Sequence, residues 1–186
     1  MKALKVIFSG LLLSTSMSSM AGGSLDLSLS DDTVRLEYDA TKANSNLHLS
    51  AGIMHHMEDG DLISLGLHVV DVRQANSPLY IGVGGKIFGF KNEDISGGAL
   101  GVGGFISYDI PQVPDVGVSA HAYYAPNVVS FGDTENLTDA DVRVSYSIIP
   151  TARVYLGYRY TAFKIEDVKK TAELDQGFHL GLKVDF

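Results

Sequence analysis

The stretch from Gln176 to Phe186 constrains the fold more than any other part of the chain. In an extended strand, side chains at every second position point to the same side. Here one side is wholly apolar, and the other carries glycine, histidine and charged residues. The pattern predicts a β-strand with one apolar face, and the strand ends on an aromatic residue. Its apolar face consists of Phe178, Leu180, Leu182, Val184 and Phe186.

This ending resembles the closing strand of bacterial outer-membrane β-barrels. In that class a terminal phenylalanine, with apolar residues at every second place before it, is read by the barrel assembly machinery. The resemblance implies that the same five residues, Phe178 to Phe186 in steps of two, form an assembly signal. The closing strand of an ordinary β-sandwich is the alternative, and the other end of the chain helps to decide between them.

The first residues have the composition of a secretory signal peptide. Two lysines precede an apolar run at residues 6–13, and small residues stand three and one positions before a cleavage point between Ala21 and Gly22. The run is far shorter than the roughly 20 residues that a membrane-spanning helix needs. We therefore expect residues 1–21 to be a cleaved leader and residues 22–186 to form one domain.

Composition narrows the class of protein further. The chain contains no cysteine, so an exported protein of this kind is not held together by disulfides. Loss of Lys2 and Lys5 with the leader leaves 12 of 14 basic residues against 22 acidic ones, and the formal net charge moves from −8 to −10. This balance argues against nucleic acid as a partner, because phosphates need a basic surface. No cofactor is expected.

Alternation with period two continues along the mature chain and indicates ten strands. An even number returns both termini to the periplasmic side, where turns are short, and puts the longer loops after Lys91, Ala125 and Lys164 outside. Eight strands is the alternative if the first hairpin does not join the wall. The predicted strands are residues 23–30, 33–40, 46–57, 62–72, 79–90, 98–110, 116–124, 138–149, 153–163 and 176–186.

We expect these strands to form an all-β, antiparallel, up-and-down transmembrane barrel. Hydrocarbon leaves no partner for a free backbone N–H or C=O, so a sheet with open edges is excluded there. By this phase Leu156 faces lipid and Gly157 the lumen, so we expect Leu156→Arg to be costly and Gly157→Ser nearly silent. Tyrosines toward strand ends are expected to form interface girdles: Tyr38, Tyr108, Tyr124, Tyr146, Tyr158 and Tyr160.

Several segments together resemble the YfaZ family of outer-membrane proteins, over nearly the whole mature chain. The resemblance implies a small barrel in the outer membrane of a Gram-negative bacterium, in contact with lipid and lipopolysaccharide, with the barrel assembly machinery as a partner; we favour a monomer. It implies no catalytic residues. The segments are SLGLHVVD at 64–71, NSPLYIGVGGK at 76–86, YYAPN at 123–127 with SFGD at 130–133, and ARVYLGYR at 152–159.

The inward phase collects many charged side chains. One reading is a structural barrel with a mixed-sign, hydrogen-bonded interior, because unpaired charges in a narrow lumen are costly. The other is a narrow path for small solutes, with inward glycines leaving space rather than accommodating aromatic rings. The predicted lumen residues are Asp26, Arg35, Glu37, Asp39, His48, His68, Lys86, Asp109, His121, Arg143, Arg153, Arg159, His179, Lys183 and Asp185.

A lipid-modifying hydrolase is the alternative function. His48 with Ser50, and Ser119 with His121, place a hydroxyl and a base two residues apart on one face of a strand. Both pairs face the lumen by phase, away from any lipid chain, so we expect no enzyme activity. The adjacent pair of histidines at residues 55–56 is not expected to bind metal, because neighbouring strand residues point to opposite faces.

Overall fold

The structure is a computed structural model, and it describes residues 22–41, 46–70, 77–92, 96–165 and 171–186. The predicted leader and Ala21 lie outside these residues, so the signal peptide stays a prediction. No helix in the described part of the chain is long and apolar enough to cross a membrane.

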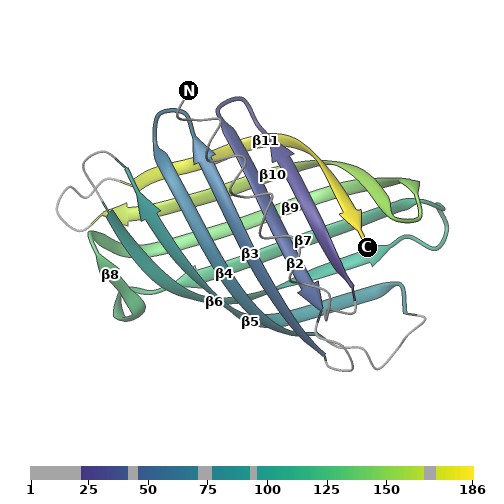
Figure 1. Cartoon of the computed structure of the whole chain (residues 1–186), viewed down its shortest axis with the longest axis horizontal. Helices are drawn as coiled ribbons and strands as arrows, with labels where there is room; N and C mark the ends of the chain where they lie inside the picture. The colour runs from purple at the N-terminus through teal and green to yellow at the C-terminus, as the bar shows by residue number, and fades with distance from the viewer. Residues whose placement is uncertain (1–21, 42–45, 71–76, 93–95, 166–170) are drawn as a thin grey trace.

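Antiparallel strands make up nearly all of the described chain (Figure 1). A short 3₁₀ helix, η2 (Asn127–Val129), and a three-residue strand, β8 (Ser130–Gly132), lie between two of the long strands. The long strands are β1 (Gly23–Leu29), β2 (Thr33–Thr41), β3 (Leu47–His56), β4 (Gly60–Val70), β5 (Leu79–Lys91), β6 (Ser96–Asp109), β7 (Val116–Ala125), β9 (Thr134–Ile149), β10 (Ala152–Ile165) and β11 (Thr171–Asp185).

The sheet closes on itself because β1 pairs with both β2 and β11. Leu27 of β1 lies opposite Leu36 on one side and Leu182 on the other. The β5–β6 pairing completes the ring, and β8 is only an added strand on β6. The wall therefore has ten strands, which confirms the prediction of ten over eight and of a closed antiparallel barrel.

The structure departs most from the predicted strand boundaries at three places, and by only one or two residues elsewhere. β9 begins at Thr134 rather than residue 138, and β11 begins at Thr171 rather than residue 176. The predicted interruption after Ala125 also contains η2 and β8. These stretches lie at the end of the barrel away from the termini. Their apolar residues Leu137 and Leu174 are buried inside the barrel, so the outward apolar alternation does not extend into them.

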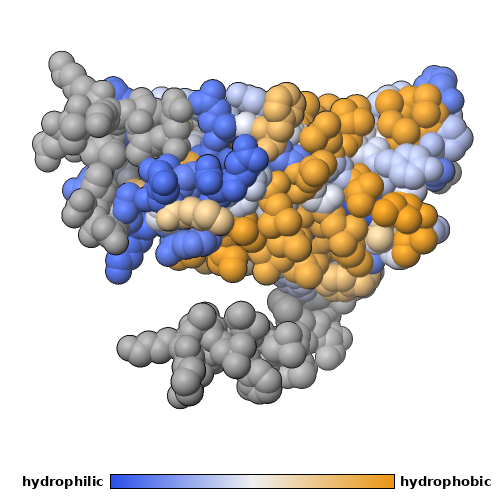
Figure 2. Space-filling model, turned by 90° about the horizontal axis from the view of Figure 1, so that it is seen from above, coloured by the Kyte–Doolittle hydropathy of each residue, from blue (hydrophilic) through white to orange (hydrophobic). Residues whose placement is uncertain are grey.

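The two faces of the wall differ sharply, as β4 illustrates. Ile63 and Leu65 are 59% and 62% exposed on the outer surface, whereas Leu62 and His68 are 4% and 2% exposed on the inner one. On the face seen in Figure 2, the outer apolar residues gather in a broad zone, with hydrophilic residues toward either end. This is the surface that a bilayer requires of a barrel.

The predicted girdle tyrosines fall into two groups by register. Tyr38, Tyr108 and Tyr146 lie toward the end that holds the termini. Tyr124, Tyr158 and Tyr160 lie toward the opposite end. Two separate groups of outward tyrosines are the arrangement expected at the two membrane interfaces.

Candidate functional site

The interior of the barrel has three successive layers. We call the end that holds Gly23 and Phe186 the terminal end, where their backbones form two hydrogen bonds. A cavity occupies this end, a layer of ion pairs follows, and apolar side chains fill the opposite end. Because side chains alternate along every strand, a long strand such as β10 contributes inward residues to successive layers: Tyr155 to the cavity wall, Arg159 to the ion pairs and Phe163 to the apolar end.

The cavity has a volume of about 530 Å³. Gly22, Ser77 and Asp109 line it near the terminal end, and Glu37 and Tyr123 line it at depth. Twelve of the predicted lumen residues stand on its wall: Asp26, Glu37, Asp39, His48, His68, Lys86, Asp109, His121, Arg143, Arg153, Lys183 and Asp185. The remaining three, Arg35, Arg159 and His179, are buried in the layer of ion pairs.

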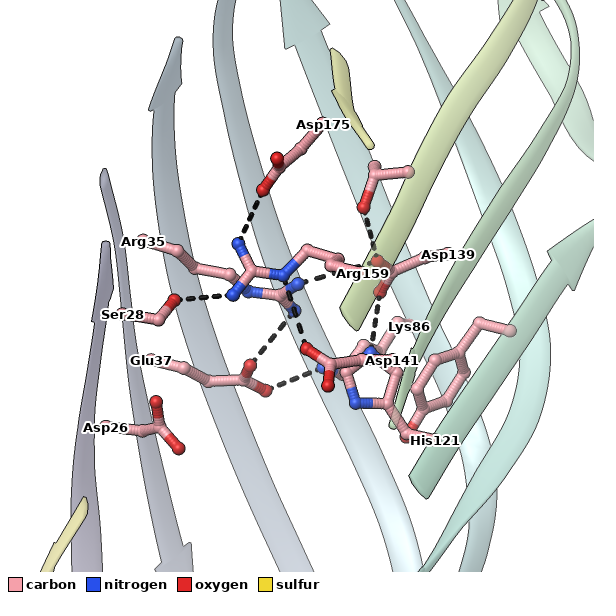
Figure 3. Close-up of polar contacts among 12 residues, drawn as sticks. Asp26, Ser28, Arg35, Glu37, Lys86, His121, Asp139, Asp141, Arg159 and Asp175 are labelled. Atoms are coloured by element: carbon pink, nitrogen blue, oxygen red, sulfur yellow. Dashed lines mark hydrogen bonds and ion pairs between the residues drawn. The ribbon is translucent and has the colours of Figure 1, made fainter. Parts of the chain in front are cut away.

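Arg159 is the centre of the ion-pair layer (Figure 3). Its side chain is 1% exposed, and its Nε and Nη1 atoms donate to Asp141 Oδ2 at 3.3 Å and Asp175 Oδ2 at 2.8 Å. Its Nη2 atom donates to Ser28 Oγ at 2.5 Å. One guanidinium thus joins β1, β9 and β11 from its place on β10, in the planar, multiply bonded manner that arginine favours.

A second series of contacts crosses the bore and links β2 with β5 and β9. Arg35 Nη1 lies 3.5 Å from Asp139 Oδ1, and Arg35 Nη2 lies 3.0 Å from Glu37 Oε2. Lys86 Nζ on β5 donates to Glu37 Oε1 at 2.6 Å. Figure 3 shows these groups converging on the middle of the barrel. The charges alternate in sign, so each buried ion has a counter-ion, without which burial would be strongly unfavourable.

Arg143 forms the boundary between this layer and the cavity. Its Nη1 atom lies 2.6 Å from Asp26 Oδ2, and its Nε atom lies 2.9 Å from Asp141 Oδ1. The guanidinium carbon stands 4.4 Å from the centre of the Tyr155 ring, and the Tyr155 hydroxyl donates to Asp26. Asp26 is therefore fully engaged by two partners on β9 and β10.

Sequence reasoning missed three acidic residues that hold this network together: Asp139, Asp141 and Asp175. Asp139 and Asp141 have the same strand parity as Arg143, so continuing the inward phase of β9 would have identified them. Asp175 was assigned to the loop after Lys164, although the structure places it in β11, paired with Thr161. Nothing in its polar neighbourhood indicates that it faces inward.

The layer at the opposite end is apolar, which the predicted charged interior did not include. Its residues are buried, and the rings of Phe90 and Phe163 stack with centroids 5.0 Å apart. The inward phase therefore changes from polar to apolar along the bore. The main members of this apolar layer are Met54, Leu62, Phe88, Phe90, Leu137, Phe163 and Leu174.

Inward glycines accommodate aromatic rings, which was one of the two readings of these positions. A Cβ atom at Gly82 would overlap the Phe105 ring, and one at Gly181 would overlap the Tyr155 ring. Gly157 corrects our expectation for serine at that position. Its Cβ would lie 2.5 Å from the buried His179 ring, so Gly157→Ser is not silent.

The two serine–histidine pairs do not form a catalytic arrangement. His48, Ser50, Ser119 and His121 all face the cavity rather than the lipid. Within the described residues Ser50 Oγ has no hydrogen-bond partner. His48 contacts the Asp39 carboxylate at 2.8 Å instead. A serine nucleophile requires a base in contact with its hydroxyl, and neither pair shows this contact in the described part of the chain.

The adjacent histidines at the β3–β4 turn diverge as expected. His55 Nδ1 lies 2.7 Å from Asp61 on the outer side, whereas His56 Nδ1 accepts hydrogen bonds from the backbone of Glu58 and Asp59. No cluster of metal-ligating side chains occurs in the part of the chain that the structure describes.

A closed ten-strand barrel, apolar outside and charged within, defines an outer-membrane β-barrel protein. The chain belongs to the YfaZ family: the family model described as "YfaZ precursor" matches residues 1–186. Outer membrane protein YfaZ of Escherichia coli (strain K12) is 27% identical over 143 residues, which cover 76% of each chain. The protein is accordingly an outer-membrane protein.

Solved structures of outer-membrane proteins resemble the barrel only distantly. The KdgM porin has 14% identity and a TM-score of 0.47, with 89% of this chain and 99% of the porin covered. The outer-membrane channel DcaP of Acinetobacter baumannii has 12% identity and a TM-score of 0.45, with 87% of this chain and 54% of DcaP covered.

Proposed function

We propose that this protein is a non-catalytic barrel of the outer membrane whose bore is closed to freely diffusing ions and solutes. The observation that carries the proposal is the pair of layers beyond the cavity. Arg35, Asp139 and Arg159 are 4%, 0% and 1% exposed, and the apolar layer behind them is equally buried. A structural barrel is therefore favoured over a narrow path for solutes.

Physical reasons support a stable closure. A conducting pore presents a hydrated path with a field of one sign. Here carboxylates and guanidinium groups bridge the bore in pairs, and separating a pair would leave an uncompensated buried charge. The stacked rings of Phe90 and Phe163 add an apolar constriction behind the pairs, and such constrictions exclude water.

A planar-bilayer recording on refolded protein tests the proposal. Wild-type barrel should give no steady current, while a change in gel mobility on heating shows that the barrel is folded. The double variant Arg159→Ala, Phe163→Ala removes one side chain from each closing layer and should give measurable, intermittent currents. Its matched control is Leu156→Ala, Tyr158→Ala, which changes two outward residues of the same strand.

The outcomes separate the candidate roles. Large, steady channels from the wild-type barrel would contradict closure and support a porin-like role. Silence of the wild type and the control, with current from the lumen variant, supports a bore closed by these two layers. Silence of all three supports a structural role in which further side chains contribute to the closure.

A further inference from the structure

The cavity at the terminal end contains groups that a merely closed barrel does not need. We propose that it is a binding site for a small organic anion that carries a planar ring and a carboxylate or phosphate group. The charged group would lie at Lys183, and the ring against the wall formed by Tyr80 and Phe105. This inference goes beyond the closed-barrel function, because a barrel sealed at the opposite end has no use for this cavity.

Lys183 is the cation available to a ligand. It lies directly opposite Arg153 in the β10–β11 ladder, and like charges in such a pair repel. Arg153 is balanced by the Asp185 carboxylate at 3.2 Å and by Asp109 at 3.9 Å. Asp26, opposite Lys183 on β1, is already engaged by Arg143 and Tyr155. Among the described residues Lys183 has no ion pair, so a bound anion would complete its surroundings.

An aromatic wall lies on the β5–β6 side of the same cavity. The rings of Tyr80 and Phe105 have centroids 5.6 Å apart, and both line the cavity. The Tyr80 hydroxyl lies 3.0 Å from His48 Nε2, which fixes the ring in place. Aromatic faces of this kind pack against planar or apolar groups of a ligand.

Two side chains of the same wall carry buried polar atoms that are not satisfied by the described residues. Ser50 Oγ and His68 Nδ1 belong to side chains that are 7% and 2% exposed and line the cavity. Neither atom has a hydrogen-bond partner among the described residues. Buried polar atoms normally have partners. Both atoms have almost no accessible surface, so either side chain would have to turn toward the cavity before a ligand there could pair with it. A volume of about 530 Å³ lies within the usual range for small-molecule sites.

Benzoate is the probe, since it has a ring and one carboxylate. Saturation-transfer NMR on the wild-type barrel in an uncharged detergent should show saturable binding, with acetate and benzyl alcohol binding much more weakly. Lys183→Gln should weaken benzoate binding at least about tenfold. Its matched control, Lys164→Gln, makes the same change on β10 at the opposite end of the barrel and should leave binding unchanged. A heat-dependent gel shift confirms that each variant is folded.

Location is tested separately. The chain contains no tryptophan, so Tyr80→Trp gives a single reporter on the cavity wall, and Phe131→Trp gives one outside the bore. Benzoate should change the emission of the first variant only. The proposal is overturned if wild-type protein shows no saturable binding, if Lys183→Gln and Lys164→Gln behave alike, or if both reporters respond equally. A wild-type barrel that conducts would contradict the closed-bore function and leave this binding test unaffected.

Discussion

Arg35 Nη1 lies 3.5 Å from Asp139 Oδ1, and this contact joins β2 to β9, four steps apart around the wall of the barrel. Both side chains are buried, and Asp139 also accepts a hydrogen bond of 2.8 Å from Thr161. The pair therefore ties together parts of the wall that share no backbone hydrogen bonds.

Asp139→Asn should destabilise the barrel by about 3 to 5 kcal/mol, because the Arg35 guanidinium then loses a buried counter-ion. Equilibrium unfolding in urea with refolded protein measures the change. The matched control is Glu135→Gln on the same strand, whose partially exposed pair with Lys164 is worth about 0 to 1 kcal/mol. Equal losses of unfolding free energy in the two variants would show that a buried ion pair of this layer stabilises the barrel no more than a partially exposed pair does.

Leu156→Arg should cost roughly 2 to 4 kcal/mol, since the side chain is 52% exposed on the apolar outer band near the middle of β10. Val128→Arg is the control, because Val128 is exposed in η2, in the connection beyond the end of β7. Unfolding titrations in lipid bilayers compare them. A larger loss from Val128→Arg would place the hydrocarbon region elsewhere on the barrel.

Phe186→Ala should sharply lower the amount of heat-modifiable barrel in the outer membrane while export continues. The exposed ring contacts Tyr38 at a centroid distance of 6.2 Å, and the backbone pairing with Gly23 is retained in the variant. Purified variant refolded in detergent should accordingly keep nearly wild-type stability. Phe131→Ala changes an exposed ring outside the closing strand and serves as the control. Normal assembly of Phe186→Ala would contradict the role of this residue as an assembly signal.

Gly181→Ala should destabilise the barrel by about 1 to 3 kcal/mol through overpacking. The new Cβ atom would lie 2.6 Å from the Leu27 carbonyl oxygen and would overlap the Tyr155 ring. Gly85→Ala is the control, because its nearest neighbour would be 3.3 Å away. Thermal unfolding followed by circular dichroism measures both, and an unchanged midpoint for Gly181→Ala would mean that the Tyr155 ring moves aside freely.

The period-two pattern was sufficient to predict the ten strands and their two faces, because lipid imposes a strict difference between them. On β4, Ile63 is exposed on the outer surface and His68 is buried in the lumen, as their alternation predicts. The pattern does not continue into the first residues of β11, where the apolar Leu174 is buried inside the barrel, and so the early start of β11 at Thr171 was missed.

Partners across the bore were beyond sequence reasoning for a different reason. Alternation says that Arg35 points inward but not that it meets Asp139, since the contact depends on how far the strands are staggered around the ring. The apolar layer was hidden for a similar reason. Alternation places Phe88 in phase with Lys86 and Phe163 in phase with Arg159, but it does not say that these rings gather in one layer with side chains of other strands.

β1 is only seven residues long, yet it is the strand that completes the ring. Its partners on one side are residues 180–185 of β11, at the other extreme of the chain. Apart from this β1–β11 pairing and the insertion of β8, the long strands pair with strands adjacent to them in sequence order, so hairpins can form locally. The contacts of Arg143 with Asp26 and of Arg159 with Ser28 span 117 and 131 residues. We therefore expect this seam to close late in folding, and the contacts of Asp26 and Ser28 with the two arginines to form with it.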